Sequence, residues 1–137
     1  MSNEENWDKE ITKEVIELHK FFQNWFNGMI PESDFSRFSD VMAPNFKIIS
    51  PSGELTEQST LISSLRNAYG KNSTLQISVQ NISVYPISSN IYLAIYEEVQ
   101  RQGLELTTRI SSALFSKNDE LLNNYNWLHV HETWKSV

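Results

Sequence analysis

Apolar residues recur at intervals of three and four along the first part of the chain, which is the period of one face of a helix. The series consists of Trp7, Ile11, Val15, Leu18, Phe22, Trp25 and Met29. Ser2 and Glu5 have the spacing of a capping box, and Asn27-Gly28 followed by Pro31 is a stop signal. The pattern predicts one long amphipathic helix that ends near Gly28.

Two shorter helices are predicted next. The first covers 34–42, with Ser33 as its cap, and the second runs from Thr56 to about Tyr69. Between them, 46–50 has the composition of a strand and is followed by a turn. The first half of the chain is therefore expected to be mostly helical.

From residue 73 the apolar period changes to two, which indicates strands. Leu75, Ile77 and Val79 alternate with polar residues, and the alternation resumes at Ile82 after a change of phase that predicts a bulge. Three further strands are predicted, over 91–101, 104–117 and 126–134. The fold class that follows is α+β, a single domain over 1–137 with three N-terminal helices packed on a curved antiparallel sheet of four to five strands.

The strands 91–101 and 104–117 are joined by Gln102-Gly103, which is short enough for a tight hairpin. Counting back from a two-residue loop predicts that Tyr96 lies opposite Arg109, with Glu98 on the same face. The opposite face of this hairpin is aliphatic.

The last strand reads Asn-Trp-Leu-His-Val-His-Glu-Thr-Trp. Successive side chains of a strand point to opposite faces. Simple alternation therefore places Trp127, His129, His131 and Thr133 on one face. The other face then carries Leu128, Val130, Glu132 and Trp134.

Composition narrows the function classes. The chain has 137 residues, no cysteine and a formal charge of −6, from 17 acidic residues against 11 Lys and Arg. No basic run exists to follow a phosphate backbone, so no nucleic-acid partner is expected. No segment is apolar for long enough to span a bilayer, and the first five residues are acidic where a secretory signal would be basic. These features predict a cytoplasmic protein without a membrane partner.

The order of the predicted elements and two segments of the sequence resemble a known family. Residues 109–117 read Arg-Ile-Ser-Ser-Ala-Leu-Phe-Ser-Lys, and residues 127–132 read Trp-Leu-His-Val-His-Glu. The chain resembles the nuclear transport factor two-like superfamily, also described as cystatin-like cones, and within it the SnoaL-like proteins. The resemblance implies a cone with a central pocket for a small apolar molecule, and a homodimer formed through the convex face of the sheet. It implies no cofactor. Ketosteroid isomerases, scytalone dehydratases and polyketide cyclases belong to the same superfamily.

We assign the face that carries Tyr96, Glu98 and Arg109 to the pocket, together with the Trp127 face of the last strand. In this assignment His131 is a general acid or base assisted by Glu98 and Tyr96, because an imidazole titrates near neutral pH. The alternative is a core histidine with a hydrogen-bond partner. The expected ligand-binding residues are Trp127, His129, Arg109, Trp25 and Phe22, of which the aromatic ones also serve the core.

Two further features have simpler interpretations. His129 and His131 have the spacing of a metal pair, for which Glu98 or His19 would be the third ligand, but we expect no metal site. Asp40 is interpreted as the partner of Arg37 in an ion pair on the second helix.

The sequence thus predicts a pocket protein for a small apolar or aromatic ligand, with cofactor-free proton transfer (isomerisation, dehydration or cyclisation) as its expected chemistry. The alternative is a non-catalytic dimeric association module on the same fold, with its pocket filled by its own aromatic residues.

Overall fold

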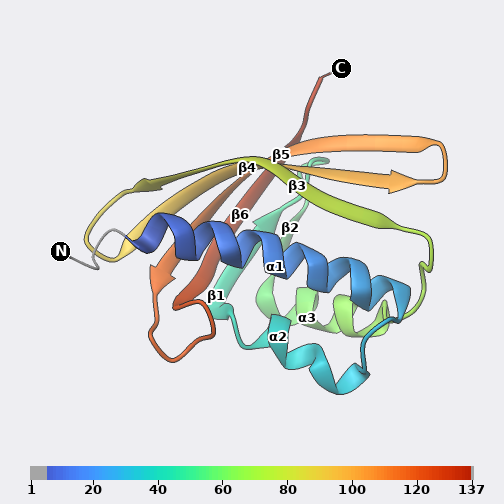
Figure 1. Cartoon of the computed structure of the whole chain (residues 1–137), viewed down its shortest axis with the longest axis horizontal. Coiled ribbons are helices and arrows are strands. Elements are labelled where there is room, and N and C mark those ends of the chain that lie inside the picture. Colours follow the sequence, from blue (N-terminus) through green and yellow to red (C-terminus); the bar gives the residue numbers. More distant parts are fainter. Residues whose placement is uncertain (1–5, 137) are drawn as a thin grey trace.

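The computed structural model describes residues 6–136. The elements are α1 (Trp7–Asn27), η2 (Glu32–Phe35), α2 (Ser36–Ser39), β1 (Met42–Ile49), β2 (Leu55–Glu57), α3 (Gln58–Asn67), β3 (Gln76–Pro86), β4 (Ile91–Gln102), β5 (Glu105–Lys117) and β6 (Tyr125–Trp134). The capping box expected at Ser2 and Glu5 lies outside the described residues. The helices pack against one face of a curved sheet, with α1 crossing it and α2 and α3 beside α1 (Figure 1). The α+β class is confirmed.

The sheet has six strands in the order β2-β1-β6-β5-β4-β3. Two features differ from the prediction of four to five antiparallel strands. β2 is a three-residue strand that pairs with β1, and β1 runs parallel to β6. The parallel contact joins the first and last strands and brings the two halves of the chain into one sheet.

The end of α1 is fixed by a close contact between two glycines. Gly28 has a φ of 71°, the left-handed conformation that favours glycine after a helix. A Cβ at Gly28 would lie 3.2 Å from the Cα of Gly70, so a side chain would also crowd the end of the third helix. Gly70 N–H donates to the carbonyl of Trp25 at 3.0 Å. This contact sets the ends of α1 and α3 side by side.

The bulge predicted in β3 is confirmed, because its pairing with β4 shifts between Gln80 and Ser83. The β4–β5 hairpin differs from the prediction by one residue at its tip. Gln102 pairs with Glu105, so the loop is Gly103-Leu104. The register therefore moves by two residues, and Glu98 rather than Tyr96 lies opposite Arg109. An even shift keeps each side chain on its predicted face.

β6 contains a bulge that the sequence did not reveal. Phe115 pairs with Trp127, but the preceding residue, Leu114, pairs with His129, so Leu128 is the additional residue. Trp127 and Val130 are buried on the inner face, whereas His131 is exposed. The predicted alternation is therefore wrong after Trp127: Val130, Glu132 and Trp134 have the parity of the inner face, and His129 and His131 that of the outer face.

The core fills the space between the helices and the inner face of the sheet. Its largest fully buried side chains include Trp25, Trp127, Tyr96, Phe38 and Phe115. Within residues 6–136, none of the helices is both long enough and apolar enough to cross a membrane.

Candidate functional site

A cavity of about 190 Å³ lies between the helices and the inner face of the sheet. Most of its wall is apolar: Leu18, Phe22, Phe26, Phe38, Met42, Phe46, Ile48, Leu61, Leu65, Ile77, Trp127 and Val130. The polar lining residues are His19 from α1, Tyr96, Glu98 and Gln100 from β4, Arg109 from β5 and Glu132 from β6. An apolar cavity with a few polar groups is the usual form of a small-molecule site.

His19 and Glu98 form a buried ion pair. His19 Nδ1 lies 2.7 Å from the carbonyl oxygen of Val15, which can only accept, so Nδ1 carries a proton. Nε2 lies 3.2 Å from Glu98 Oε1, and a carboxylate there requires a second proton on the ring. Burial opposes the charge on His19, but the hydrogen bond and charge of Glu98 outweigh it and raise the pKa of His19. The imidazole is therefore held as a cation.

Glu98 is the anion of this pair. Its second oxygen, Oε2, accepts from Gln100 Nε2 at 2.6 Å. Burial alone would raise the pKa of Glu98, but the hydrogen bond and charge of His19, with help from Gln100 and Arg109, lower it to about 2. Glu98 therefore stays ionised at physiological pH and is a weak base, which does not favour the expected role as a proton acceptor.

Arg109 and Glu132 form the second pair. Arg109 Nη1 donates to Glu132 Oε1 at 3.2 Å, and the guanidinium lies 4.8 Å from the centre of the Trp134 ring. Among the side chains of residues 6–136, Arg109 Nε is the one buried nitrogen or oxygen without a hydrogen-bond partner. A buried N–H left unpaired is costly, so the Arg109 side chain is a candidate contact for a ligand acceptor.

Glu132 is bound less completely than Glu98. Its second oxygen is 3.5 Å from Ser111 Oγ, at the limit of a hydrogen bond. Burial and the charge of Glu98 raise the pKa of Glu132, against the opposing charge of Arg109. Tyr96 is also buried in this cluster, and burial with the nearby carboxylates raises its pKa well above the usual value. The tyrosine is therefore neutral, and Glu132 is the lining carboxyl group best placed to exchange a proton.

The structure brings together five of the eight predicted site residues. Tyr96, Glu98, Arg109, Trp127 and Phe22 all line the cavity. They come from the helix and the three strands expected to form the pocket, which is why the face assignment holds for them.

The other three residues lie elsewhere. His131 is exposed and His129 half-buried, both on the outer face of β6, so their expected position in the pocket is wrong. The bulge at Leu128 is the physical reason, because one additional residue reverses every later side chain. Trp25 is buried in the core, where its indole N–H donates to the Leu65 carbonyl at 2.6 Å, and it is not part of the cavity wall.

The residues considered for a metal site do not lie together. His129 and His131 lie on the outer face, whereas Glu98 and His19 lie on the inner face. The proposed third ligands are therefore on the other side of the sheet. Among the described residues, no group of three His, Cys, Asp or Glu side chains is arranged to hold a metal ion.

Two important residues were missed from the sequence. His19 was considered only as a metal ligand, although its place next to Leu18 and four residues after Val15 puts it on the buried side of α1. Glu132 was placed on the wrong face. The signal for it was the spacing of three between Trp127 and Val130, which breaks the period of two.

A third buried carboxylate, Glu14 on α1, lies outside the cavity wall. Arg37 Nη2 and Nη1 donate to its two oxygens at 2.9 and 3.2 Å. Asn123 Nδ2 donates at 2.9 Å, and the indole N–H of Trp127 donates at 2.8 Å. Arg37 thus pairs with Glu14 rather than with Asp40, and the expected ion pair with Asp40 is wrong.

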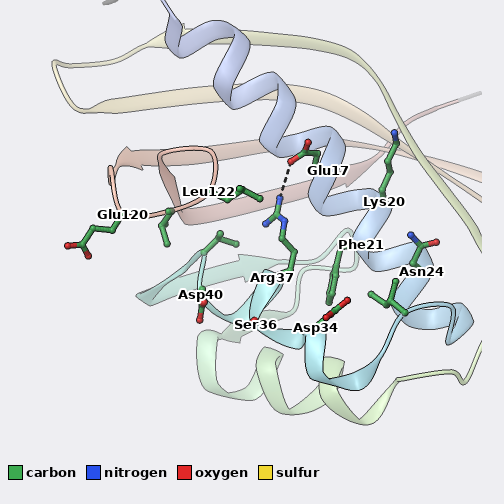
Figure 2. A pocket seen from close by; sticks show the side chains of 13 residues that line it. Glu17, Lys20, Phe21, Asn24, Asp34, Ser36, Arg37, Asp40, Glu120 and Leu122 are labelled. Atoms are coloured by element: carbon green, nitrogen blue, oxygen red, sulfur yellow. Dashed lines mark ion pairs between the residues drawn. The ribbon is translucent and has the colours of Figure 1, made fainter.

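An open groove lies outside this network, between α1, α2 and the loop that precedes β6 (Figure 2). In Figure 2, Arg37 reaches from α2 toward Glu17 on α1, a contact of 4.0 Å, while Asp40 and Glu120 point away from that pair. The charged residues of the groove are four anions and two cations, and exposed ion pairs contribute little. The groove is a weaker candidate site than the cavity, whose wall contains the buried ion pairs.

Comparison with known proteins gives a family and a fold. The sequence model of the family described as sucrose-6-phosphate phosphohydrolase C-terminal matches residues 11–136. Sucrose-phosphatase 1 of Nicotiana tabacum is 29% identical over 126 residues, and sucrose-phosphatase 2 of the same plant is 25% identical. Each alignment covers 88% of this chain but only 30% of the relative. The chain therefore spans less than a third of the length of these curated relatives.

Solved structures confirm the resemblance to the nuclear transport factor two-like superfamily. An NTF-2 like protein of unknown function from Pseudomonas aeruginosa superposes with a TM-score of 0.84 at 20% identity, covering 93% of this chain and 99% of that one. A CaMKII hub from S. rosetta superposes with a TM-score of 0.78 at 13% identity, covering 94% and 97%. Identities this low establish the fold alone.

Proposed function

The chain belongs to the sucrose-6-phosphate phosphohydrolase C-terminal family, and on this premise we propose that the domain binds a small, mainly apolar molecule in its cavity. The observation that carries the proposal is that Arg109, which lines a mostly apolar cavity, has a buried Nε–H without a partner. Among the other polar residues of the wall, Glu98 is bonded to His19 and Gln100, and Glu132 is bonded to Arg109. A hydrogen-bond acceptor on the ligand would give Arg109 the partner that it lacks.

Cavity size sets the ligand class. At about 190 Å³ the cavity is smaller than the roughly 300–1,000 Å³ typical of sites for drug-sized molecules. A disaccharide is of drug size, so we propose a ligand smaller than the sugar named in the family description. The cavity would therefore bind a second compound, distinct from the substrate of the curated relatives.

The expected cofactor-free proton transfer needs a different residue from the one predicted. His131 is on the outer face, so it is not a candidate for proton transfer in the cavity. Glu132 takes its place, because its raised pKa suits proton exchange better than the pKa of Glu98 does. Tyr96 would remain a neutral hydrogen-bond donor.

Thermal unfolding against small aromatic and aliphatic compounds tests the proposal. A ligand at about 100 times its dissociation constant should stabilise the fold by roughly 2.7 kcal/mol. Ile48 lines the cavity, whereas its neighbour Ile49 has the opposite parity on the same strand. Ile48→Phe should abolish the stabilisation, and Ile49→Phe should preserve it. Equal loss in both variants, or no stabilising compound, would contradict the proposal.

Association through the outer face is the second candidate function. Apolar side chains lie on that face, where no described helix covers them: Tyr85, Leu93, Ile95, Val99, Leu106, Ile110 and Leu114. Tyr85 and Leu106 are about half exposed. The likeness to a hub structure supports this proposal without identifying a partner.

Analytical ultracentrifugation tests the association. Ile110→Asp should convert a wild-type dimer into a monomer, because a buried charge at an apolar interface is costly. Leu122→Asp is the matched control, since Leu122 is 71% exposed in the loop before β6. A monomeric wild type at high concentration would remove this candidate.

A further inference from the structure

The arrangement of Arg109 between two carboxylates points to the chemical class of the cavity ligand. Arg109 pairs across the strands with Glu98 on β4 and donates to Glu132 on β6. Its Nε–H has no partner, and Arg109 is one of the residues that line the cavity. Of the guanidinium nitrogens, Nη1 is the one that donates to a described side chain, so Nε and Nη2 remain for a ligand oxygen.

Charge counting shows what a carboxylate ligand would encounter. With all four groups ionised, His19 and Arg109 balance Glu98 and Glu132, and the buried cluster is neutral. A third carboxylate beside Arg109 would leave one uncompensated negative charge in a buried site, which is costly. Carboxylates held this close normally share a proton.

We propose that the cavity takes a small monocarboxylate, whose anion binds the Arg109 guanidinium while Glu132 takes up one proton and donates a hydrogen bond to a ligand oxygen. This inference rests on the proposed pocket function and names its ligand class. Binding therefore takes up one ligand anion and one solvent proton, so the net charge of the site does not change. The one bond formed is the O–H bond of Glu132, whose proton comes from solvent.

Glu132 rather than Glu98 accepts the proton because of their partners. Glu98 accepts from both His19 and Gln100, and its pKa is about 2. Glu132 has one long bond to Arg109 and a marginal one to Ser111. Its pKa is already raised by burial and by the charge of Glu98. Protonation therefore costs least at Glu132.

The groups facing Glu132 come from three elements. β5 contributes the cation Arg109, β4 contributes the anion Glu98 and the neutral Tyr96, and α1 contributes the cation His19. The cavity residues of β1 are Met42, Phe46 and Ile48, and those of α3 are Leu61 and Leu65, none of which titrates. A ligand anion is the change that would raise the pKa of Glu132 further.

Isothermal titration calorimetry with benzoate and with neutral benzamide tests this inference. Both compounds are small and planar, and they differ in charge. Between the pKa of Glu132 in the free protein and its pKa in the complex, benzoate affinity should fall about tenfold per pH unit. Buffers of different ionisation enthalpy should report uptake of close to one proton. Benzamide should bind with no proton uptake.

Variants assign the proton. Glu132→Gln should retain benzoate binding, lose proton uptake and keep its low-pH affinity at pH 8. Glu97→Gln is the matched control, because Glu97 is an outer-face carboxylate on β4 that pairs with Lys135 and not with the cavity. It should behave as wild type. The double variant Arg109→Gln with Glu132→Gln removes both charges and should bind benzamide but not benzoate.

The outcomes separate this inference from the proposed function. Benzamide binding without benzoate binding, or benzoate binding without proton uptake, would overturn the carboxylate inference and leave the pocket proposal standing. Proton uptake that persists in Glu132→Gln would also overturn it. If neither compound binds and no small compound stabilises the fold, both proposals fail together.

Discussion

Glu14 and Glu132 are both buried carboxylates paired with an arginine, yet their surroundings differ. The two oxygens of Glu14 receive four hydrogen bonds, from Arg37, Asn123 and Trp127. Those of Glu132 receive one bond of 3.2 Å and one of 3.5 Å. The saturated carboxylate joins α1, α2 and β6, whereas the unsaturated one lies in the cavity wall.

The difference distinguishes a structural ion pair from the pair at which we propose that a ligand binds. Buried polar groups in a structural role are fully hydrogen-bonded. A missing hydrogen bond there would lower the stability of the fold, and no ligand would compensate for it. At Arg109 that cost is present, and a ligand can recover it. Trp127 connects the two regions, since its ring lines the cavity and its N–H binds Glu14.

Removal of the saturated carboxylate should have the largest effect. Glu14→Ala leaves the Arg37 guanidinium, the Asn123 amide and the Trp127 indole without their acceptor. Loss of one partner of a buried pair costs about 3–5 kcal/mol, which denaturant unfolding measures. Glu17→Ala removes a carboxylate 4.0 Å from the same arginine and more exposed, and should cost less than about 1 kcal/mol. Similar losses in the two variants would contradict the structural role of Glu14.

The His19–Glu98 pair predicts how stability depends on pH. The pKa of Glu98 is lowered from 4.5 to about 2, so its contribution is present above pH 4.5 and is lost as the pH falls toward 2. The pKa of His19 is raised from 6.5, so its contribution is present below pH 6.5 and is lost as the pH rises through the folded-state value. The acid loss is on the order of 3 kcal/mol.

Urea unfolding between pH 2 and 9 measures the loss of stability at both the acid and the alkaline end. The double variant His19→Gln with Glu98→Gln should have a flatter profile, because the pair no longer titrates. Glu132 works in the opposite sense to Glu98: its raised pKa means that its ionisation opposes folding as the pH rises. A double variant with the wild-type profile would show that the pair is not ionic.

A substitution at the residue shared by both regions should have an intermediate effect. Trp127→Phe keeps an aromatic ring in the cavity wall but removes the N–H bonded to Glu14 at 2.8 Å. A lost hydrogen bond to a charged group costs about 1.5–3 kcal/mol, measurable by thermal unfolding. Benzoate binding should keep its proton uptake, because Glu132 is untouched. Loss of that uptake would mean that the two regions are coupled.

Most of the fold could be predicted because its signals are local. The period of α1, the stop at Gly28 and the bulge in β3 are all visible in the sequence. β2 was missed because three residues form a strand only when β1 is beside them. The parallel contact between β1 and β6 was missed because it depends on residues about 80 positions apart.

The faces of the strand residues were predicted correctly where the register error was even and wrongly where it was odd. The hairpin register was shifted by two residues, so Tyr96, Glu98 and Arg109 kept their face. The bulge at Leu128 added one residue and reversed the histidines. Such a bulge depends on how Trp127 and Val130 pack against the helices, and alternation within the strand does not contain that information.

The smallest expected effect tests this reversal directly. His131→Ala removes an exposed outer-face side chain and should change the free energy of unfolding by less than about 0.5 kcal/mol. Affinity for benzoate should also stay unchanged, because the sheet separates His131 from the cavity. His19→Ala is the contrast, since it leaves Glu98 as a buried anion without its cation. If His131→Ala weakened ligand binding as much as His19→Ala did, the arrangement of β6 would be contradicted. His129 and His131 would then lie on the inner face.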